Sequence, residues 1–519
     1  MNRKLNLKFI LGVFTLSALG LTFSIGAQEG SRDIERVWGP RYRASRRVEM
    51  PERHPFRHGG NSLLRLMHWN EVAINASGLD HTPVAPGENR VFGEQLGPGR
   101  SSRAMAIVHI AVFDAVNAIT GEFHSYSNIP RVREETSVDS AIAQAAHDTL
   151  TALFPSQEAS FDQILAQDLN QIPGGRAKAN GISLGHGSAA AILALRNNDG
   201  SQHPDPHMGI DFFPSQDPGK WRQDPIGLSP LALGAHWGEV TPFVLTSPNQ
   251  FRAPVPPAMT SPEYTTAFNE VKRLGGDGIV TPTERTPEQT QTGIYWAYDG
   301  TPSMCAPPRL YNQITMQIAE DRHTNNVADL ARLLALVNTA MADASVAVWE
   351  SKYFYQYWRP ITGIRESDPG TGPSGLGDGN PATTCDPTFS PLGAPASNLA
   401  GPNFTPPFPA YPSGHAGFGG ALFQTLRNFY RTDHIAFSFI SDEFNGVTED
   451  NQGNVRPLIE RHFSSLSQAE EENGQSRIYL GIHWRFDKTA GIAQGRSVAN
   501  YVFNNAFQPR RDGRGDDDR

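Results

Sequence analysis

Three short segments near the C-terminus bring together the residue types that bind a tetrahedral oxyanion. They are residues 352–360 (KYFYQYWRP), 412–415 (PSGH) and 476–487 (SRIYLGIHWRFD). Lys352, Arg359 and Arg477 supply three cations, and few acids accompany them. Arginine side chains match the oxygens of phosphate-like anions with paired N–H donors. The segments therefore predict an oxyanion pocket.

The first segment places two cations at helical spacing. Lys352 and Arg359 lie seven residues apart, which is almost two turns, so we expect both on one face of a helix that Pro360 ends. A solvated basic face is the ordinary explanation of such a pair. The aromatic residues around it favour a pocket instead.

The second segment predicts the start of a helix at about His415. Free backbone N–H groups and the positive end of the helix dipole make such a start an anion site. Ser413 can donate its hydroxyl, Gly414 lets an anion approach its amide, and His415 is placed for proton transfer. A plain helix cap with Ser413 as the capping residue is the alternative.

The third segment contains a histidine and a carboxylate four residues apart. This spacing lets Asp487 orient the imidazole of His483. Arg477 lies six residues before His483, about 240° around a continuous helix, so the two converge only if the backbone breaks between them. Gly481 is the natural place for that break.

The residue types in these segments exclude a common cation site. Zn²⁺ and Mg²⁺ require carboxylates or several neutral imidazoles, which these segments do not supply. The predicted ligand is phosphate or its analogue vanadate. Both accept a fifth, axial ligand, and His483 is the candidate donor.

The elements that must position these residues are predicted to be helices. Apolar residues recur at helical spacing over 62–76, 102–120, 138–154, 179–197, 287–298, 310–349, 415–430 and 476–503. Strand-like alternation is scarce, and long Pro/Gly-rich loops span 201–262 and 366–412. We therefore expect an all-α fold of two helical bundles in one compact unit, and neither a Rossmann fold nor a barrel.

Length, composition and the N-terminus limit the class of protein. The chain has 519 residues, 38% of them hydrophobic, and can bury a large core. A net charge of −9 without a basic stripe argues against nucleic-acid binding. Basic residues before the apolar run 9–25 predict a signal peptide, and hence a secreted or periplasmic protein with no membrane contact after cleavage. An uncleaved anchor is the alternative.

These observations suggest a division of the chain into five parts. They give no prediction of the oligomeric state. The predicted parts are a signal peptide (1–27), an N-terminal arm (28–60), an N-terminal helical bundle region (61–300), a C-terminal helical bundle carrying the anion site (301–507) and a disordered charged tail (508–519). Cys305 and Cys385 can form one disulfide in an oxidising compartment or remain two free thiols.

The motifs of the three segments resemble a known family signature. The pattern Lys-x6-Arg-Pro, Pro-Ser-Gly-His, Ser-Arg-x3-Gly-x-His-x3-Asp is similar to that of vanadium-dependent haloperoxidases and type 2 phosphatidic-acid phosphatases. The likeness to the vanadium chloroperoxidase branch extends over WNEVAINA (69–76), YWAYDGTP (295–302), PPRLYNQI (307–314) and PPFPAYPSGHAGFGGA (406–421). It implies an all-α fold of two four-helix bundles.

The resemblance implies a cofactor and a set of ligands for it. The residues that would bind the vanadate oxygens are Lys352, Arg359, Ser413, Gly414 and Arg477. His483 would be the axial ligand to vanadium. His415 would be the acid/base that helps to deliver hydrogen peroxide.

It also implies residues around the cofactor. Asp299 would pair with Arg477, and Asp487 would orient His483. Trp349 and Phe408 match positions that line a halide site, with simple core packing as the alternative for both.

The activity implied by the resemblance is that of a vanadate-dependent haloperoxidase. Such an enzyme oxidises chloride or bromide with hydrogen peroxide to hypohalous acid, which halogenates a small organic acceptor, and it needs no haem or flavin. One alternative is a soluble secreted acid phosphatase in which His483 forms a phosphohistidine. A non-catalytic oxyanion-binding protein is another, although it would not need His415.

Overall fold

Helices dominate the structure, a computed structural model that describes residues 32–45, 48–53 and 62–510. The predicted signal peptide and all but the first three residues of the predicted tail lie outside these ranges. The helices are α2 (Ser62–Asp80), α3 (Gly97–Thr120), α4 (Val138–Leu153), α5 (Glu158–Asn170), α6 (Arg176–Leu195), α7 (Pro262–Leu274), α8 (Pro287–Tyr295), α9 (Pro307–Asp321), α10 (Val327–Tyr355), α11 (Pro360–Arg365), α12 (Gly414–Tyr430), α13 (Leu466–Tyr479) and α14 (Arg485–Asn505), with 3-10 turns η1 (Pro155–Gln157) and η2 (Trp237–Glu239). The predicted all-α class is confirmed.

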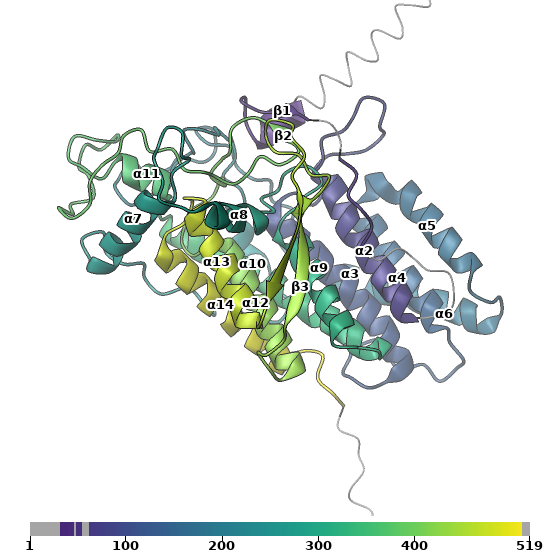
Figure 1. Ribbon diagram of the computed structural model, residues 1–519. Helices are drawn as coiled ribbons and strands as arrows, with labels where there is room; N and C mark the ends of the chain where they lie inside the picture. The colour runs from purple at the N-terminus through teal and green to yellow at the C-terminus, as the bar shows by residue number, and fades with distance from the viewer. Residues whose placement is uncertain (1–31, 46–47, 54–61, 511–519) are drawn as a thin grey trace, which may run out of the picture.

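Two small antiparallel pairs of strands accompany the helices. β1 (Arg43–Ala44) pairs with β2 (Leu399–Ala400), and β3 (Phe437–Asn445) pairs with β4 (Leu458–Phe463). The longer hairpin, β3–β4, was missed from the sequence. It crosses the front of the molecule beside α9 and α12 (Figure 1).

One predicted helix is wrong in its extent. Residues 310–349 form two helices, because the chain turns after Asp321 and starts again at Val327. His323 has a φ of 52°, and the Asn326 side chain accepts hydrogen bonds from the first amides of α10. An asparagine cap of this kind favours a new helix start over a continuous helix.

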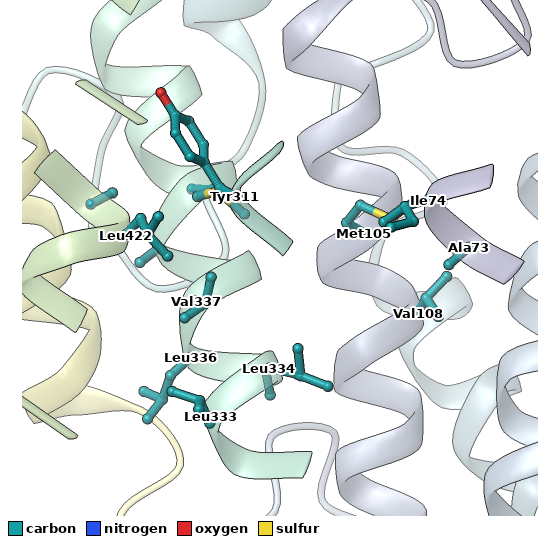
Figure 2. Packing of buried hydrophobic residues seen from close by; sticks show 14 of the residues in the cluster. Ala73, Ile74, Met105, Val108, Tyr311, Leu333, Leu334, Leu336, Val337 and Leu422 are labelled. Carbon is teal, nitrogen blue, oxygen red and sulfur yellow. The ribbon is translucent and has the colours of Figure 1, made fainter. Parts of the chain in front are cut away.

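The longest helices, α3 and α10, lie in the core. Both are long and apolar enough to cross a membrane, yet 89% and 100% of their most apolar windows are buried in the protein. Figure 2 shows Leu334 of α10 pointing toward α3, which carries Met105 and Val108, with Leu333 and Leu336 on the opposite side. One apolar cluster joins these residues, so α10 connects the N-terminal and C-terminal helices. The division into two four-helix bundles stays a prediction.

Close packing of α12 against α14 positions the predicted anion site. A Cβ on Gly495 would lie 2.0 Å from the Gly417 carbonyl oxygen, and one on Gly420 would lie 2.5 Å from that of Ile492. Glycines at this contact let the two helix backbones approach closely. The approach brings the start of α12 against the first turn of α14.

The two cysteines are far from forming a bridge. Cys305 is buried and Cys385 is half-buried, and both are free thiols. Of the two sequence alternatives, the structure has the unpaired one.

Candidate active site

The C-terminal end of α10 contributes a buried lysine. Lys352 is fully buried, and its Nζ donates hydrogen bonds to the carbonyl oxygens of Pro409 (2.8 Å) and Ala410 (3.0 Å). The same nitrogen lies 5.1 Å from the ring centre of Phe408. These contacts fix the ammonium group beside the loop that leads into α12.

Arg359 reaches the site by a different route from the one predicted. The prediction that Arg359 and Lys352 share one face of a helix is wrong, because α10 ends at Tyr355 and Gln356 takes a left-handed conformation. Pro360 starts α11 instead of ending a helix, since proline is favoured at a first helical position where no N–H is needed. Arg359 itself is the extended residue that precedes α11, and its Nε donates a hydrogen bond to the Phe408 carbonyl oxygen at 2.9 Å.

The start of α12 matches its prediction closely. The helix begins at Gly414, and Ser413 is its cap, accepting a hydrogen bond from the Ala416 amide at 3.4 Å. A hydroxyl that accepts one bond still has its own proton to donate, so capping and anion binding are compatible. The Ser413 amide donates to the Asp487 carbonyl oxygen at 3.0 Å, which ties α12 to α14.

The predicted break at Gly481 is confirmed. Helix α13 ends at Tyr479 and α14 begins at Arg485. Gly481 has a φ of 72°, and a Cβ there would lie 2.4 Å from the Gly275 carbonyl oxygen, so only glycine fits. The break turns the chain so that Arg477 and His483 face the same space.

His483 is oriented by the carboxylate that the spacing predicted. Its Nδ1 lies 2.8 Å from Oδ2 of Asp487, and that oxygen also accepts the Trp484 amide at 3.0 Å. With Nδ1 donating, Nε2 carries the lone pair, and it accepts a hydrogen bond from Arg359 Nη1 at 2.9 Å. The imidazole thus presents its Nε2 lone pair to a cluster of cations, one of which, Arg359, donates a hydrogen bond to it.

Asp299 lies beside Arg477 and His415. Arg477 Nη2 donates to Asp299 Oδ1 at 2.6 Å, and His415 Nε2 is 3.9 Å from the same oxygen. His415 Nε2 also donates to the Ala297 carbonyl oxygen. The pairing implied for Asp299 and Arg477 is therefore present.

Strand β3 holds the backbone on which Asp299 sits, and this support was missed from the sequence. The Tyr298 amide donates to Glu443 Oε1 at 3.4 Å, and the Asp442 amide donates to the Tyr298 hydroxyl at 2.6 Å. Both strand residues are fully buried. The buried, alternating aromatic residues at 437 and 439 were the only sequence signal for this strand.

Several N–H donors of the arginines in the site have no hydrogen-bond acceptor among the described residues. Among the described residues, no partner contacts the buried atoms Arg359 Nη2, Arg477 Nε and Arg477 Nη1. Buried donors without acceptors are costly. These three nitrogens therefore require an acceptor to which none of the described residues is bonded.

Burial and mutual repulsion shift the pKa values of these cations. Burial, with Arg359 nearby, holds the pKa of Lys352 well below its usual range. Burial, with Arg477 nearby, lowers the pKa of Arg359 to about 9 and that of His415 to about 3. An anion placed among these groups would relieve the repulsion.

The same causes act on His483 and Asp487. Burial, followed by Arg359, lowers the pKa of His483, so its imidazole is neutral. Burial raises the pKa of Asp487 to about 7, and Lys352 and Arg359 oppose that rise.

Comparison with known proteins agrees with this geometry. A family model described as the second helical-bundle domain of VCPO matches residues 332–512. A vanadium chloroperoxidase from Curvularia inaequalis is 31% identical over 509 residues, covering 82% of this chain and 79% of the relative. The chain belongs to the vanadium haloperoxidase family.

Solved structures of bacterial proteins share the fold of this haloperoxidase. A vanadium-dependent iodoperoxidase superposes with a TM-score of 0.65 at 22% identity, over 86% of this chain and 98% of its own. The holo form of a vanadium-dependent chloroperoxidase superposes with a TM-score of 0.59 at 17% identity, over 80% and 93%.

A mostly apolar channel leads to the basic cluster of this haloperoxidase. His415, Arg477 and His483 are among the residues that line it, and its wall includes Trp349 and Phe408. The two rings lie 5.0 Å apart between centres. Both predicted halide-site residues thus line the channel as well as packing in the core.

Proposed function

We propose that the protein is a vanadate-dependent haloperoxidase that oxidises chloride or bromide with hydrogen peroxide. The product is hypohalous acid, which halogenates a small organic acceptor. The observation that carries this proposal is the buried basic site, in which arginine N–H groups without partners accompany the unprotonated Nε2 of His483. Membership of the vanadium haloperoxidase family supports it.

The residues present fit a vanadate ion. Arg359 Nη2 together with Nε and Nη1 of Arg477 would donate to its oxygens, alongside the Ser413 hydroxyl and the Gly414 amide. His483 Nε2 would bind the metal. When bound, vanadate supplies a Lewis-acidic centre that activates peroxide while vanadium stays in the +5 state.

Asp487 and Asp299 hold the two histidines and the arginine in place. Asp487 fixes the tautomer of His483 by accepting from Nδ1, which leaves Nε2 unprotonated for the metal. Asp299 accepts from Arg477 and neutralises part of the charge beside His415. Correct orientation before reaction is the main contribution of both carboxylates.

His415 and Lys352 would act on the incoming peroxide. Burial lowers the pKa of His415 to about 3, and with Nε2 donating to the Ala297 carbonyl oxygen its lone pair is on Nδ1. A bound anion would raise this pKa toward the range in which an imidazole can accept a proton from hydrogen peroxide. Lys352 Nζ makes two hydrogen bonds and has a third donor position for the reacting oxygen. A cation there stabilises the negative charge that develops as halide attacks.

The apolar wall suits the halide. Trp349 and Phe408 offer a weakly solvating surface next to Lys352, with its Nζ 5.6 Å and 5.1 Å from their ring centres. A partly desolvated halide is stabilised by a nearby cation in such surroundings.

We also propose, from residues 1–27, that the protein is exported before it acts.

A test separates this function from that of a phosphatase. Protein reconstituted with orthovanadate should halogenate monochlorodimedone when given hydrogen peroxide and bromide. Rapid hydrolysis of p-nitrophenyl phosphate without halogenation by any halide would decide for the phosphohistidine enzyme instead.

A further inference from the structure

An N-terminal segment forms part of the channel wall, far in sequence from the other wall residues. We call residues 32–45 the N-terminal strap. Its first residues, 32–37, are helical, and Val37 and Trp38 line the channel together with residues near the active site. Trp38 is 5% exposed, so its ring is enclosed by the molecule.

The first half of the strap is fixed by close contacts. Ser229 Oγ donates to the Val37 carbonyl oxygen at 2.7 Å, and the Trp38 ring lies 5.7 Å from that of Phe92. Gly39 has a φ of 106°, and a Cβ there would lie 2.6 Å from the Leu228 carbonyl oxygen. The strap therefore lies tightly on the loop around residue 228.

The second half of the strap packs on the loop that carries Phe408. The Tyr42 ring meets that of Phe404 edge-on at 6.2 Å between centres. Strand β1 then pairs with β2, in the register Arg43 with Ala400. Contacts at Val37 and Gly39 and contacts from Tyr42 to Ala44 thus hold the strap on both sides of the segment that carries Trp38.

The same apolar cluster reaches the backbone next to the axial histidine. Ile34, Trp38 and Tyr42 belong to a cluster with Leu480 and Ile482, which flank Gly481 just before His483. Both residues are fully buried. The strap therefore shares one apolar cluster with the turn that positions His483, and it also lines the channel.

The free space in the channel is small. Its volume is about 60 Å³. One water needs about 10–15 Å³ by this measure, whereas a cavity that holds benzene has about 150 Å³. The space suffices for an oxyanion, a halide or hydrogen peroxide, and is too small for an aromatic ring.

We propose that Trp38 sets the upper size limit on molecules that reach the basic site, so that small oxyanions and hydrogen peroxide enter and bulkier analogues are rejected. The part concerning peroxide rests on the proposed haloperoxidase function. Trp38 acts as a specificity-determining residue of the wall. Its ring packs against that of Phe92, and we assign it an effect on access alone.

Anion binding to the protein without vanadate tests the proposal independently of catalysis. Isothermal titration calorimetry would compare orthophosphate with phenylphosphonate, which carries the same type of head group on a ring. The parent should bind phosphate and reject phenylphosphonate. In Trp38→Ala the preference for phosphate should fall by about tenfold or more, as expected when an apolar wall loses a large side chain.

Two further variants keep the result interpretable. Phe92→Ala removes the ring that packs behind Trp38 and does not line the channel, so it should lower stability while the anion preference stays that of the parent. Val37→Trp narrows the same wall and should strengthen the rejection of phenylphosphonate. This opposite sign tests the proposal even if Trp38→Ala fails to fold.

Turnover gives a second readout. With orthovanadate and bromide, the ratio of kcat/KM for tert-butyl hydroperoxide to that for hydrogen peroxide should rise in Trp38→Ala. A parent that binds phenylphosphonate as well as phosphate, or ratios unchanged in both Trp38→Ala and Val37→Trp, would overturn the proposal. A parent that binds phosphate selectively but never halogenates would instead refute the proposed function and leave the size limit standing.

Discussion

Two regions of the molecule bury arginines, and they treat the charge in opposite ways. Arg309 is fully buried, donates from Nε to Asp442 at 2.8 Å, and donates from Nη1 to the Ile74 carbonyl oxygen and to Asn75 Oδ1. Arg359 is equally buried, but its Nη2 has no partner among the described residues. One arginine is satisfied by the fold, and the other has a donor to spare.

The pKa values show the same difference. Despite burial, Asp442 raises the pKa of Arg309 above its usual value. Burial and the neighbouring Arg477 lower the pKa of Arg359 to about 9. A buried arginine with its own carboxylate serves the fold, whereas a group of buried cations with spare donors serves a ligand. This contrast identifies the basic cluster as the functional site.

The largest expected effect is that of removing the axial ligand. His483→Ala should reduce vanadate-dependent halogenation to background, because it removes the imidazole Nε2 that is predicted to bind the vanadium. The variant should remain folded, since His483 lies in the turn between α13 and α14. Halogenation rates with saturating orthovanadate measure the effect, and activity equal to that of the parent would reject the axial role.

The next prediction compares the two arginines directly. Arg309→Met should lower the free energy of unfolding by up to about 3–5 kcal/mol, because it removes one of the two arginines that pair with the buried Asp442 carboxylate and leaves only Arg53. Arg359→Met should cost the vanadate-free protein less, since it also removes repulsion from Arg477. Urea unfolding would measure both.

Added phosphate sharpens that comparison. At a hundred times its Kd, phosphate should stabilise the parent and Arg309→Met by about 2.7 kcal/mol, and should stabilise Arg359→Met less. Equal stabilisation of all three proteins would show that Arg359 does not bind the anion.

A third prediction concerns the effect of pH on the region in which Asp442 pairs with Arg53 and Arg309. Although burial opposes the shift, Arg53 and Arg309 hold the pKa of Asp442 well below its usual range. The carboxylate therefore contributes stability above about pH 4, and this contribution is lost as the pH falls toward the folded-state pKa. The stability difference between the parent and Asp442→Asn should shrink between about pH 5 and pH 3. A difference that is constant over this range would contradict the pairing.

The smallest expected effect is on halide preference. Phe408→His places a polar ring on the apolar wall beside Lys352 and should favour bromide over chloride. Relative kcat/KM values for the two halides measure the change. If their ratio stays the same, Phe408 serves packing alone.

The site was largely predictable from sequence, because its residues lie in short motifs whose local geometry follows from spacing. The cap at Ser413, the break at Gly481 and the contact of His483 with Asp487 all depend on neighbours within a few residues. The route of Arg359 was wrong because the left-handed residue Gln356 has no signal in its type.

Features that depend on distant contacts could not be predicted. Glu443 supports the Asp299 segment from a strand about 145 residues further along. Trp38 enters the channel wall from the N-terminal arm, and nothing in its neighbouring residues indicates this. Their positions are fixed by packing between segments that are far apart in the chain.

The most direct test of the account is a titration of vanadate-free protein with orthovanadate, followed by halogenation of monochlorodimedone with hydrogen peroxide and bromide. We predict that activity is absent at first, rises in proportion to added vanadate and saturates at one vanadium per chain. Activity without vanadate, or none at saturation, would contradict it.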